Sequence, residues 1–351
     1  MIGQRDYSLI GEDSRLAVEH GLATADWYRT PVERKRMKEL MQRSDGRAIR
    51  DTVVWLGSMV VLGGLAVHLW WSWWCVPLLL VYGVLYGSAS DARWHEAGHG
   101  TAFRTPWMNT VVYQIACFMM IRNPTAWRWS HTRHHTDTLI VGRDPEIVAM
   151  RPPRIGVIAM NFLGLVDAPH LLATTVRHAF GRLTPDELTY IPESERASVY
   201  RVARVWLVLY GAVLAACFSL GSILPVVLIG LPRLYGAWHH LLTGLAQHGG
   251  LAENVTDHRL NSRTIYMNPI SRFIYWNMNY HIEHHMFPMV PFHQLPALHE
   301  EIKADLPAPY VSVLSAYREF VPILFKQRRD QNVFIHVVVP ESSAPSGSDI
   351  T

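Results

Sequence analysis

The sequence is poor in cysteine and in charge. Its three cysteines, Cys75, Cys117 and Cys217, lie in apolar stretches and form no CxxC pair, which excludes a disulfide framework and a thiolate metal site. Charged residues make up 17% of the chain and the net charge is +3. This is less charge than soluble domains carry, and too weak a basic excess to indicate nucleic acid as a partner. The first residues contain no apolar run that would form a cleaved signal peptide.

Two long stretches are almost free of charge. Residues 52–90 contain no Asp, Glu, Lys or Arg, and this length fits two membrane spans joined by a short turn. The turn is expected at the tryptophan cluster 70–74, because aromatic side chains collect at membrane interfaces. Residues 205–252 contain one charge, Arg233, and the break between Gly221 and Pro225 predicts helices over about 203–220 and 224–243.

Basic residues before the first stretch set the expected orientation. Seven Lys and Arg residues lie within residues 31–51, whereas the two expected hairpin tips contain none. The lysine and arginine bias therefore places both termini and the region 91–200 in the cytoplasm. The apolar segments 105–121 and 155–180 then cannot cross twice and are expected to lie at the interface. The sequence predicts an all-α integral membrane protein with four transmembrane helices, in two hairpins, and a cytoplasmic helical cap.

This organisation divides the chain into three parts. Residues 1–51 form a cytoplasmic N-terminal segment, residues 52–315 the membrane catalytic domain, and residues 316–351 a C-terminal segment. The last part ends in a Ser- and Pro-containing tail, from Pro340, that is expected to be disordered.

Histidine is abundant and clustered. Of the 19 histidines, eight lie in three five-residue windows, HEAGH (95–99), HTRHH (131–135) and HIEHH (281–285). Positions i, i+3 and i+4 share one face of a helix, so each window presents two or three imidazoles in one direction. Eight imidazoles exceed what one metal ion needs, and two ions with four or more nitrogens each would use them. Imidazole binds Zn, Cu, Fe and Ni, so the ligand type does not name the metal. His248 is a ninth candidate, and His239 and His240 are weaker ones.

Two other classes of protein remain compatible with this pattern. HEAGH also fits HExxH, in which two histidines bind zinc and the glutamate is a base, so an intramembrane zinc metalloprotease is an alternative. A zinc metalloprotease would need only one further ligand, and this alternative gives no role to HTRHH and HIEHH. A metal carrier is a second alternative, although carriers place their ligands near the middle of the bilayer.

The sequence resembles the membrane fatty acid desaturase/hydroxylase family over residues 50–315. The resemblance is carried by HEAGH, HTRHH, the third window with its flanking residues (NYHIEHHMFP, 279–288) and AQHGG (246–250). The resemblance implies a di-iron centre, O2 as co-substrate, and electrons from an external donor, because no HPGG haem motif is present. The donor would be a ferredoxin or a cytochrome b5-like protein with its reductase. Some members have an asparagine one turn before the extra histidine, where this chain has Gly244. The implied metal ligands are His95, His99, His131, His134, His135, His248, His281, His284 and His285.

The resemblance implies an O2-dependent oxidoreductase that attacks an unactivated C–H bond. Desaturation of a fatty acyl or lipid chain is the expected reaction, and hydroxylation or oxidative demethylation of a small or lipid-like molecule is the alternative. Glu96, Glu283 and Asp137 are candidates for holding ligand histidines by their second nitrogen, and Asp91 and Asp144 are weaker ones. Arg233, expected deep in the fourth span, is a candidate for binding a polar group of the substrate.

A basic surface near the second histidine window is expected to receive the electron donor. Its charge would attract an acidic redox protein, although contacts with anionic lipid headgroups would explain the same charges. The surface comprises Arg122, Arg128, Arg133, Arg143, Arg151 and Arg154.

Overall fold

The computed structural model describes residues 5–340, and within this range the chain is helical, with two isolated bridges and no strand. The prediction of an all-α fold is therefore confirmed. The tail predicted to be disordered lies almost entirely outside the described residues. In chain order the α-helices are α1 (Glu12–Glu19), α2 (Arg34–Leu40), α3 (Asp45–His68), α4 (Cys75–Val84), α5 (Ser90–Gly98), α6 (Pro106–Met120), α7 (Pro124–Thr136), α8 (Ile155–Asn161), α9 (Asp167–Ala179), α10 (Pro185–Tyr190), α11 (Glu193–Leu220), α12 (Leu224–Leu228), α13 (Pro232–Tyr235), α14 (Trp238–His248), α15 (His258–Asn261), α16 (Pro269–Ile274), α17 (His281–Met286), α18 (Leu295–Ile302) and α19 (Val313–Gln327).

The first charge-free stretch forms two helices that pack against each other. α3 and α4 are joined by a turn at residues 69–74, in which Trp71 and Trp73 are almost fully exposed. α4 continues through a π-helical turn, η2 (Leu85–Ala89), into α5. Trp55 of α3 donates from Nε1 to the Leu85 carbonyl (2.8 Å), which fixes α3 against this turn. The first histidine window therefore follows directly from a long apolar helix.

The second stretch departs from the prediction. α11 begins at Glu193, nearly three helical turns before the expected start at about residue 203, and ends at Leu220. The continuous helix predicted over 224–243 is not formed: the chain makes three short helices, α12, α13 and α14. Proline has no N–H to continue a helical ladder, and Pro232 follows Gly230, whose φ of 116° ends the helix before it. Three stretches of the described chain are apolar and long enough to span a membrane, residues 34–68, 75–98 and 193–220.

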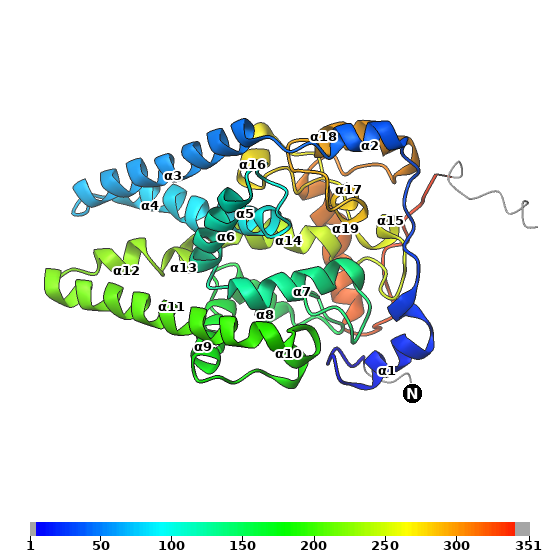
Figure 1. Cartoon of the computed structure of the whole chain (residues 1–351), viewed down its shortest axis with the longest axis horizontal. Coiled ribbons are helices and arrows are strands. Elements are labelled where there is room, and N and C mark those ends of the chain that lie inside the picture. Colours follow the sequence, from blue (N-terminus) through cyan, green and yellow to red (C-terminus); the bar gives the residue numbers. More distant parts are fainter. Residues whose placement is uncertain (1–4, 341–351) are drawn as a thin grey trace, which may run out of the picture.

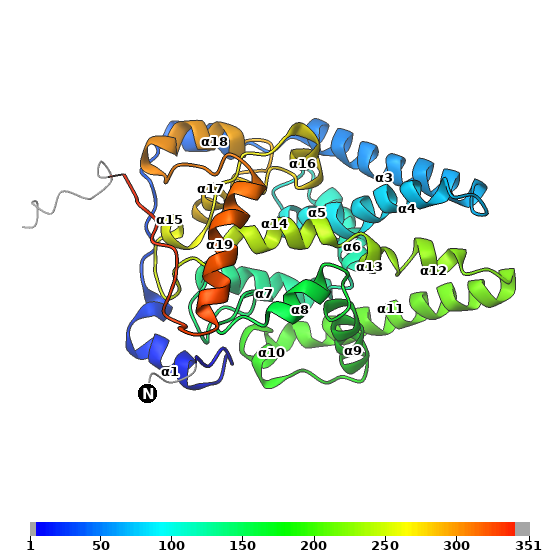
Figure 2. The same cartoon turned by 180° about the vertical axis from the view of Figure 1, so that it is seen from behind.

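The apolar helices and the histidine helices occupy different parts of the molecule. α3 with α4, and α11 with α12, extend toward one end, while α7, α14 and α17 lie in the body of the protein (Figure 1). α18 and α19 lie toward the opposite end, where the segment between α1 and α2 also runs past α15 (Figure 2). The segments expected at the interface form α6, and α8 with α9.

Candidate metal centre

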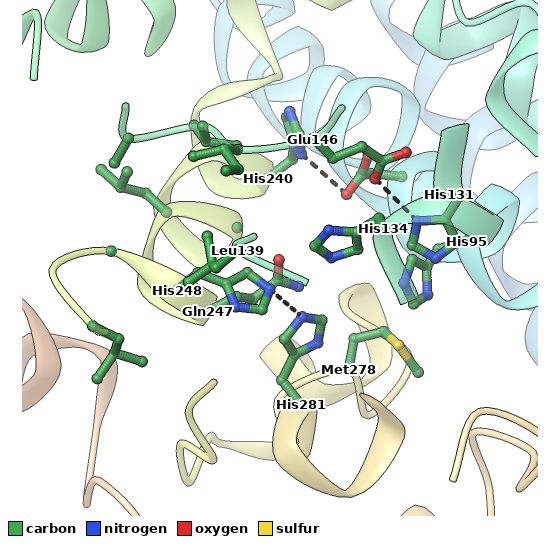
Figure 3. A pocket seen from close by; sticks show the side chains of 18 of the residues that line it. His95, His131, His134, Leu139, Glu146, His240, Gln247, His248, Met278 and His281 are labelled. Atoms are coloured by element: carbon green, nitrogen blue, oxygen red, sulfur yellow. Dashed lines mark hydrogen bonds and ion pairs between the residues drawn. The ribbon is translucent and has the colours of Figure 1, made fainter. Parts of the chain in front are cut away.

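Each histidine window lies at a short, well-fixed helical turn, as its spacing predicts. HEAGH ends α5, HTRHH ends α7 and HIEHH begins α17. α7 starts at Pro124, and the side chain of Asn123 accepts hydrogen bonds from the amides of Thr125 and Ala126, a cap that satisfies two free N–H groups. The three turns bring their rings together with His248 from the end of α14 (Figure 3).

The nine rings divide into two groups. In each group the ligand nitrogens lie within 4.8 Å of one another. His134 and His135 are neighbours in the sequence but belong to different groups, because successive residues on a helix point about 100° apart. The first group contains His95, His99, His131, His135 and His284, and the second contains His134, His248, His281 and His285.

Within each group the rings face one another through Nε2. In the first group, Nε2 of His131 lies 3.2 Å from that of His99 and 3.1 Å from that of His135. In the second, Nε2 of His281 lies 3.0 Å from those of His248 and His285. Such a set of converging nitrogens fits one metal ion per group. The donors are all imidazoles, so they suit iron, zinc, copper and nickel alike.

Oxygen atoms hold several of these rings by Nδ1. His131 Nδ1 donates to Glu146 Oε2 (3.0 Å), and His134 Nδ1 donates to Asp144 Oδ2 (2.9 Å). His248 Nδ1 donates to the Asn261 carbonyl (2.7 Å), which can only accept. The proton is therefore on Nδ1 and the lone pair is on Nε2, the tautomer that a metal ligand needs.

Burial keeps most of these rings neutral, whereas at His134 the charge and hydrogen bond of Asp144 outweigh burial and raise the pKa. Loss of water around His131 and His135, followed by repulsion from neighbouring imidazoles, lowers their pKa well below the usual value. Burial, and then the neighbouring His134, lowers the pKa of His248 to about 3. Since a protonated imidazole cannot bind a metal ion, the site is competent at neutral pH.

The three acidic residues predicted to hold ligand rings are placed elsewhere. Glu96 accepts from Thr101 Oγ1 (2.7 Å) and the Phe292 amide (3.0 Å). Glu283 accepts from Thr264 and His299. None of these partners is a ring of the two groups. Both hydrogen bonds end on Glu96 Oε1, so this oxygen is directed at Thr101 and Phe292 and not at a ring of the two groups.

Asp137 likewise does not hold a ligand ring. Its carboxylate pairs with Arg133 and Arg143, each at 3.1 Å. Asp144, a weaker candidate, takes the predicted role, and so does Glu146, which is not predicted from the sequence. Both follow HTRHH within the short segment Asp-Pro-Glu at 144–146, an acidic run close after a histidine window that could have indicated them.

A cavity adjoins both groups and is lined mainly by α5, α7 and α14. His95, His131, His134, His248 and His281 border it (Figure 3). Its wall also carries polar side chains, namely Arg122, Gln247, and His240 paired with Asp91 at 3.0 Å. His240 faces Asp91 and is not in either group of rings. His239 is also outside the two groups.

Arg233 is not among the residues that line this cavity. It is 1% exposed and pairs with Asp167 at the start of α9. The prediction that it lies at the middle of a continuous fourth helix is wrong, because Arg233 belongs to the four-residue α13. A buried ion pair of this kind joins α13 to α9 and satisfies the arginine charge.

The predicted basic surface is largely paired within the chain. Arg122 binds Asp91, Arg133 and Arg143 bind Asp137, and Arg151, which is 4% exposed, binds Glu253. Arg128 lies over the Tyr113 ring at 5.5 Å. Four of the six arginines are therefore paired, while Arg128 and Arg154 are exposed and form no ion pair within residues 5–340. The free basic face is smaller than the sequence suggested.

Comparison with known proteins agrees with this architecture. The model of the fatty acid desaturase family matches residues 70–317, more than half of the chain. Two histidine groups that could hold metal ions, beside helices long and apolar enough to span a membrane, are the features of the class to which this family belongs. The chain belongs to the fatty acid desaturase family, a family of oxidoreductase enzymes.

Several characterised desaturases are similar to it at low identity. The dihydrorhizobitoxine desaturase of Bradyrhizobium elkanii is 26% identical over 63% of this chain and 66% of that protein. The chloroplastic sn-2 acyl-lipid omega-3 desaturase (ferredoxin) of Arabidopsis thaliana is 23% identical over 60% of this chain and 51% of that protein. The endoplasmic-reticulum acyl-lipid omega-3 desaturase (cytochrome b5) of the same plant is 22% identical over 77% and 70%. The chain thus spans between half and 70% of these relatives.

Proposed function

We propose that this protein is an O2-dependent di-iron enzyme that removes two hydrogens from an unactivated carbon chain and leaves a double bond. The observation that carries the proposal is the division of nine imidazoles, six buried and three partly buried, into groups of five and four. The first group would hold one iron ion and the second group the other. When bound, the two ions would supply the oxidising chemistry that cleaves C–H bonds, which no protein side chain can perform.

The chain's own residues would bind, orient and exclude water. Glu146 and Asp144 hold His131 and His134 in the metal-binding tautomer and fix their ring planes. The cavity bordered by both groups would hold the reacting carbons beside the metal ions. Its position at the end of the apolar helix 75–98 would let a chain approach from the membrane. We propose that the site lies on the cytoplasmic side.

A fatty acyl or lipid chain is the proposed substrate. Relatives named as acyl-lipid desaturases support this choice, as do the three apolar helices that would place the enzyme in a membrane. The same relatives carry ferredoxin or cytochrome b5 in their names, and we propose a separate electron carrier of that kind here. With its reductase, the carrier would supply the electrons that O2 reduction needs beyond those from the substrate.

Metal analysis of the purified chain tests the proposal. We expect about two iron ions per chain, and a double bond in the product when a reduced carrier and O2 are supplied. His248→Ala removes one of four nitrogens from the second group and should lower iron to about one per chain, with loss of turnover. His240→Ala is the matched control on the same helix and should retain both irons. One metal ion in the fully occupied wild-type chain would contradict the proposal.

A second candidate is the oxidation of a smaller, more polar molecule, by desaturation, hydroxylation or demethylation. The observation that favours it is the polar lining of the cavity by Arg122, His240 and Gln247. A relative named for a substrate other than a fatty acid, the Bradyrhizobium enzyme, supports it. Incubating iron-loaded protein with fatty acyl lipids and with small carboxylates, followed by mass spectrometry, separates the two: an added oxygen marks hydroxylation, and a loss of two hydrogens marks desaturation.

A further inference from the structure

A stack of aromatic rings connects the second histidine group to the protein surface. Trp27 lies parallel to His258, with ring centroids 4.3 Å apart and an interplanar angle of 14°. His258 in turn lies 5.1 Å from His285, a member of the second group. His258 is 3% exposed, whereas Trp27 is partly exposed. The three rings form a continuous path of van der Waals contact from solvent to the candidate metal position.

The segment that carries Trp27 is held rigidly over the histidine helices. Trp27 Nε1 donates to the Thr136 carbonyl at the end of α7 (3.0 Å), and the Tyr28 amide donates to the Thr256 carbonyl (2.9 Å). The Arg259 guanidinium lies 3.5 Å above the Tyr28 ring. These contacts fix the indole in its stacked position. The segment lies outside residues 70–317, so it is an addition to the part of the chain that matches the family.

We propose that Trp27 and His258 form the path by which electrons enter the metal site from an acidic one-electron carrier protein docked at Trp27. The proposal rests on the proposed function, which requires such a carrier. The rate of electron tunnelling falls steeply with the distance between redox centres. A series of adjacent rings shortens the gaps that an electron must cross between the carrier and the metal site. Trp27 and His258 are positioning residues that neither gain nor lose a bond.

The electrons balance over one turnover. Two carrier molecules would each give one electron to the site that the two histidine groups would hold. O2 accepts these two electrons together with two from the substrate, whose two C–H bonds are broken. Two protons from solvent and the two substrate hydrogens then complete two molecules of water.

The location of Trp27 suits a water-soluble partner. It lies on the segment between α1 and α2, at the end of the molecule opposite the tips of α3, α4, α11 and α12 (Figures 1 and 2). Arg29, two residues further on, is exposed and forms no ion pair within residues 5–340. Asp26 and Glu33 of the same segment are also exposed, but so are Arg34 and Lys35. This small basic excess beside the partly exposed ring favours a carrier with an acidic docking face.

A second aromatic path exists and is the direct competitor. Trp94 lies 5.3 Å from His131 and 5.5 Å from Trp127, which is partly exposed. Both tryptophans line the cavity proposed for the substrate, and the Arg122 guanidinium covers Trp127 at 4.1 Å. A carrier at Trp127 would compete with substrate for the same space, which favours the path through Trp27.

Anaerobic stopped-flow reduction of the iron-loaded, full-length protein tests the path without relying on turnover. The probe is reduced plant-type ferredoxin at saturating concentration, and its oxidation is followed by absorbance. We expect Trp27→Leu to slow reduction by about tenfold, because the ring bridge is lost, and Trp27→Phe to remain close to wild type. Trp107→Leu, at an exposed tryptophan on α6, is the control and should leave the rate unchanged.

Dithionite, a small reductant that needs no docking site, should reduce wild type and Trp27→Leu at equal rates. An unchanged ferredoxin rate in Trp27→Leu would overturn the proposal. Slower reduction by dithionite as well would also overturn it, by showing that Trp27 only supports the metal site. A slow ferredoxin reaction in Trp127→Leu with a normal one in Trp27→Leu would assign the path to the cavity side.

A charge reversal tests docking without touching the stack, and it serves even if Trp27→Leu folds poorly. Arg29→Glu should lower the second-order rate with ferredoxin by about tenfold at low salt, and the difference should vanish at high salt. Arg201→Glu, an exposed arginine on α11, is the matched control. No effect of Arg29→Glu at low salt would contradict the docking site.

The failure of the proposed function would be seen separately. Protein reduced with dithionite and then exposed to O2 and substrate needs no carrier. Equal product from wild type and Trp27→Leu in this single turnover would support the proposed function whatever the role of Trp27. No product from iron-loaded wild type would refute that function independently.

Discussion

At the scale of single residues, the second nitrogen of each imidazole decides whether the ring is ready to bind a metal ion. A histidine that can rotate, or that carries its proton on Nε2, is a poor ligand in this geometry. Glu146, Asp144 and the Asn261 carbonyl each accept a hydrogen bond from Nδ1–H. These acceptors convert three histidines of ordinary sequence context into oriented Nε2 donors.

Glu146 provides a residue-scale prediction. Glu146→Ala removes the acceptor for His131 Nδ1 and should reduce iron affinity in the first group by about 10–100-fold. Glu146→Gln should lose less iron affinity, because its amide oxygen can still accept the hydrogen bond. Titration of the metal-free protein with ferrous iron measures both. Asp137→Asn, at a carboxylate that pairs only with arginines, is the control, and an equal loss of affinity there would contradict the assigned role.

At the scale of elements, close backbone contact joins two apolar arms near the site. The first arm is α3 with α4, and the second is α11 with α12 and α13. A Cβ at Gly236 would collide with the backbone of Gly83 in α4. Ser88 in the π turn donates to the Gly236 carbonyl (2.7 Å) and accepts from the His240 amide (2.8 Å). A π turn placed where an apolar helix meets a functional site is a recurrent arrangement. The glycines therefore set how near the end of α13 comes to α4.

Gly236→Ala should consequently destabilise the protein by about 1–3 kcal/mol, as overpacking of a dense core does. Its thermal midpoint in detergent should fall, together with its iron content. Gly64→Ala is the matched control, since a Cβ there would meet nothing within 4 Å in α3. That exposed helical site should gain stability slightly from the helix propensity of alanine. A Gly236→Ala protein as stable as wild type would show that α4 and α13 can separate freely.

α9 and α10 are clamped by one carboxylate. Glu187 pairs with His178 (2.8 Å) and Arg177 (2.9 Å) and forms a capping box with Thr184. Burial would raise its pKa, but the hydrogen bonds from His178 and the Thr184 amide outweigh burial and lower the pKa to about 2. The ionised form is thus more stable in the folded protein than in the unfolded chain.

The pH dependence follows from the sign of this shift. A depressed folded-state pKa gives stability that is complete above the unfolded value near 4.5 and is lost as pH falls from there toward 2. Glu187→Gln should cost about 1–3 kcal/mol at pH 7, and the gap from wild type should shrink as pH drops below about 4. Thermal unfolding of both proteins across this pH range measures it. A gap that does not change with pH would exclude the ionised clamp.

At the scale of the whole molecule, the apolar helices and the histidine cap occupy opposite parts of the protein. We expect reporter fusions at residues 72 and 222, near the tips of the two arms, to read extracytoplasmic. A reporter following the full chain should read cytoplasmic. A cytoplasmic signal at either tip would contradict the orientation proposed from the lysine and arginine bias.

The sequence by itself determined the helical class, the three histidine turns and the family. These features are local: the i, i+3, i+4 spacing and a charge-free stretch are properties of consecutive residues. The same logic indicated His248, which lies at the end of a helix beside the other rings. The sequence predicted one helix over 224–243 where the structure has α12, α13 and α14. The apolar composition of this stretch indicates a continuous helix more strongly than Gly230, Pro232 and Gly236 indicate the breaks.

Only the tertiary structure decided which rings share a metal position and what holds them. His134 and His135 enter different groups because the helix turns between them, and the partners of each group come from α5, α14 and α17. Glu146 and Asp144, and not Glu96 or Glu283, accept hydrogen bonds from ligand rings, because the chain after α7 folds back over the rings of α7. Trp27 reaches His258 across 231 positions of sequence. Such contacts depend on how separate elements pack, and periodicity along the chain carries no information about them.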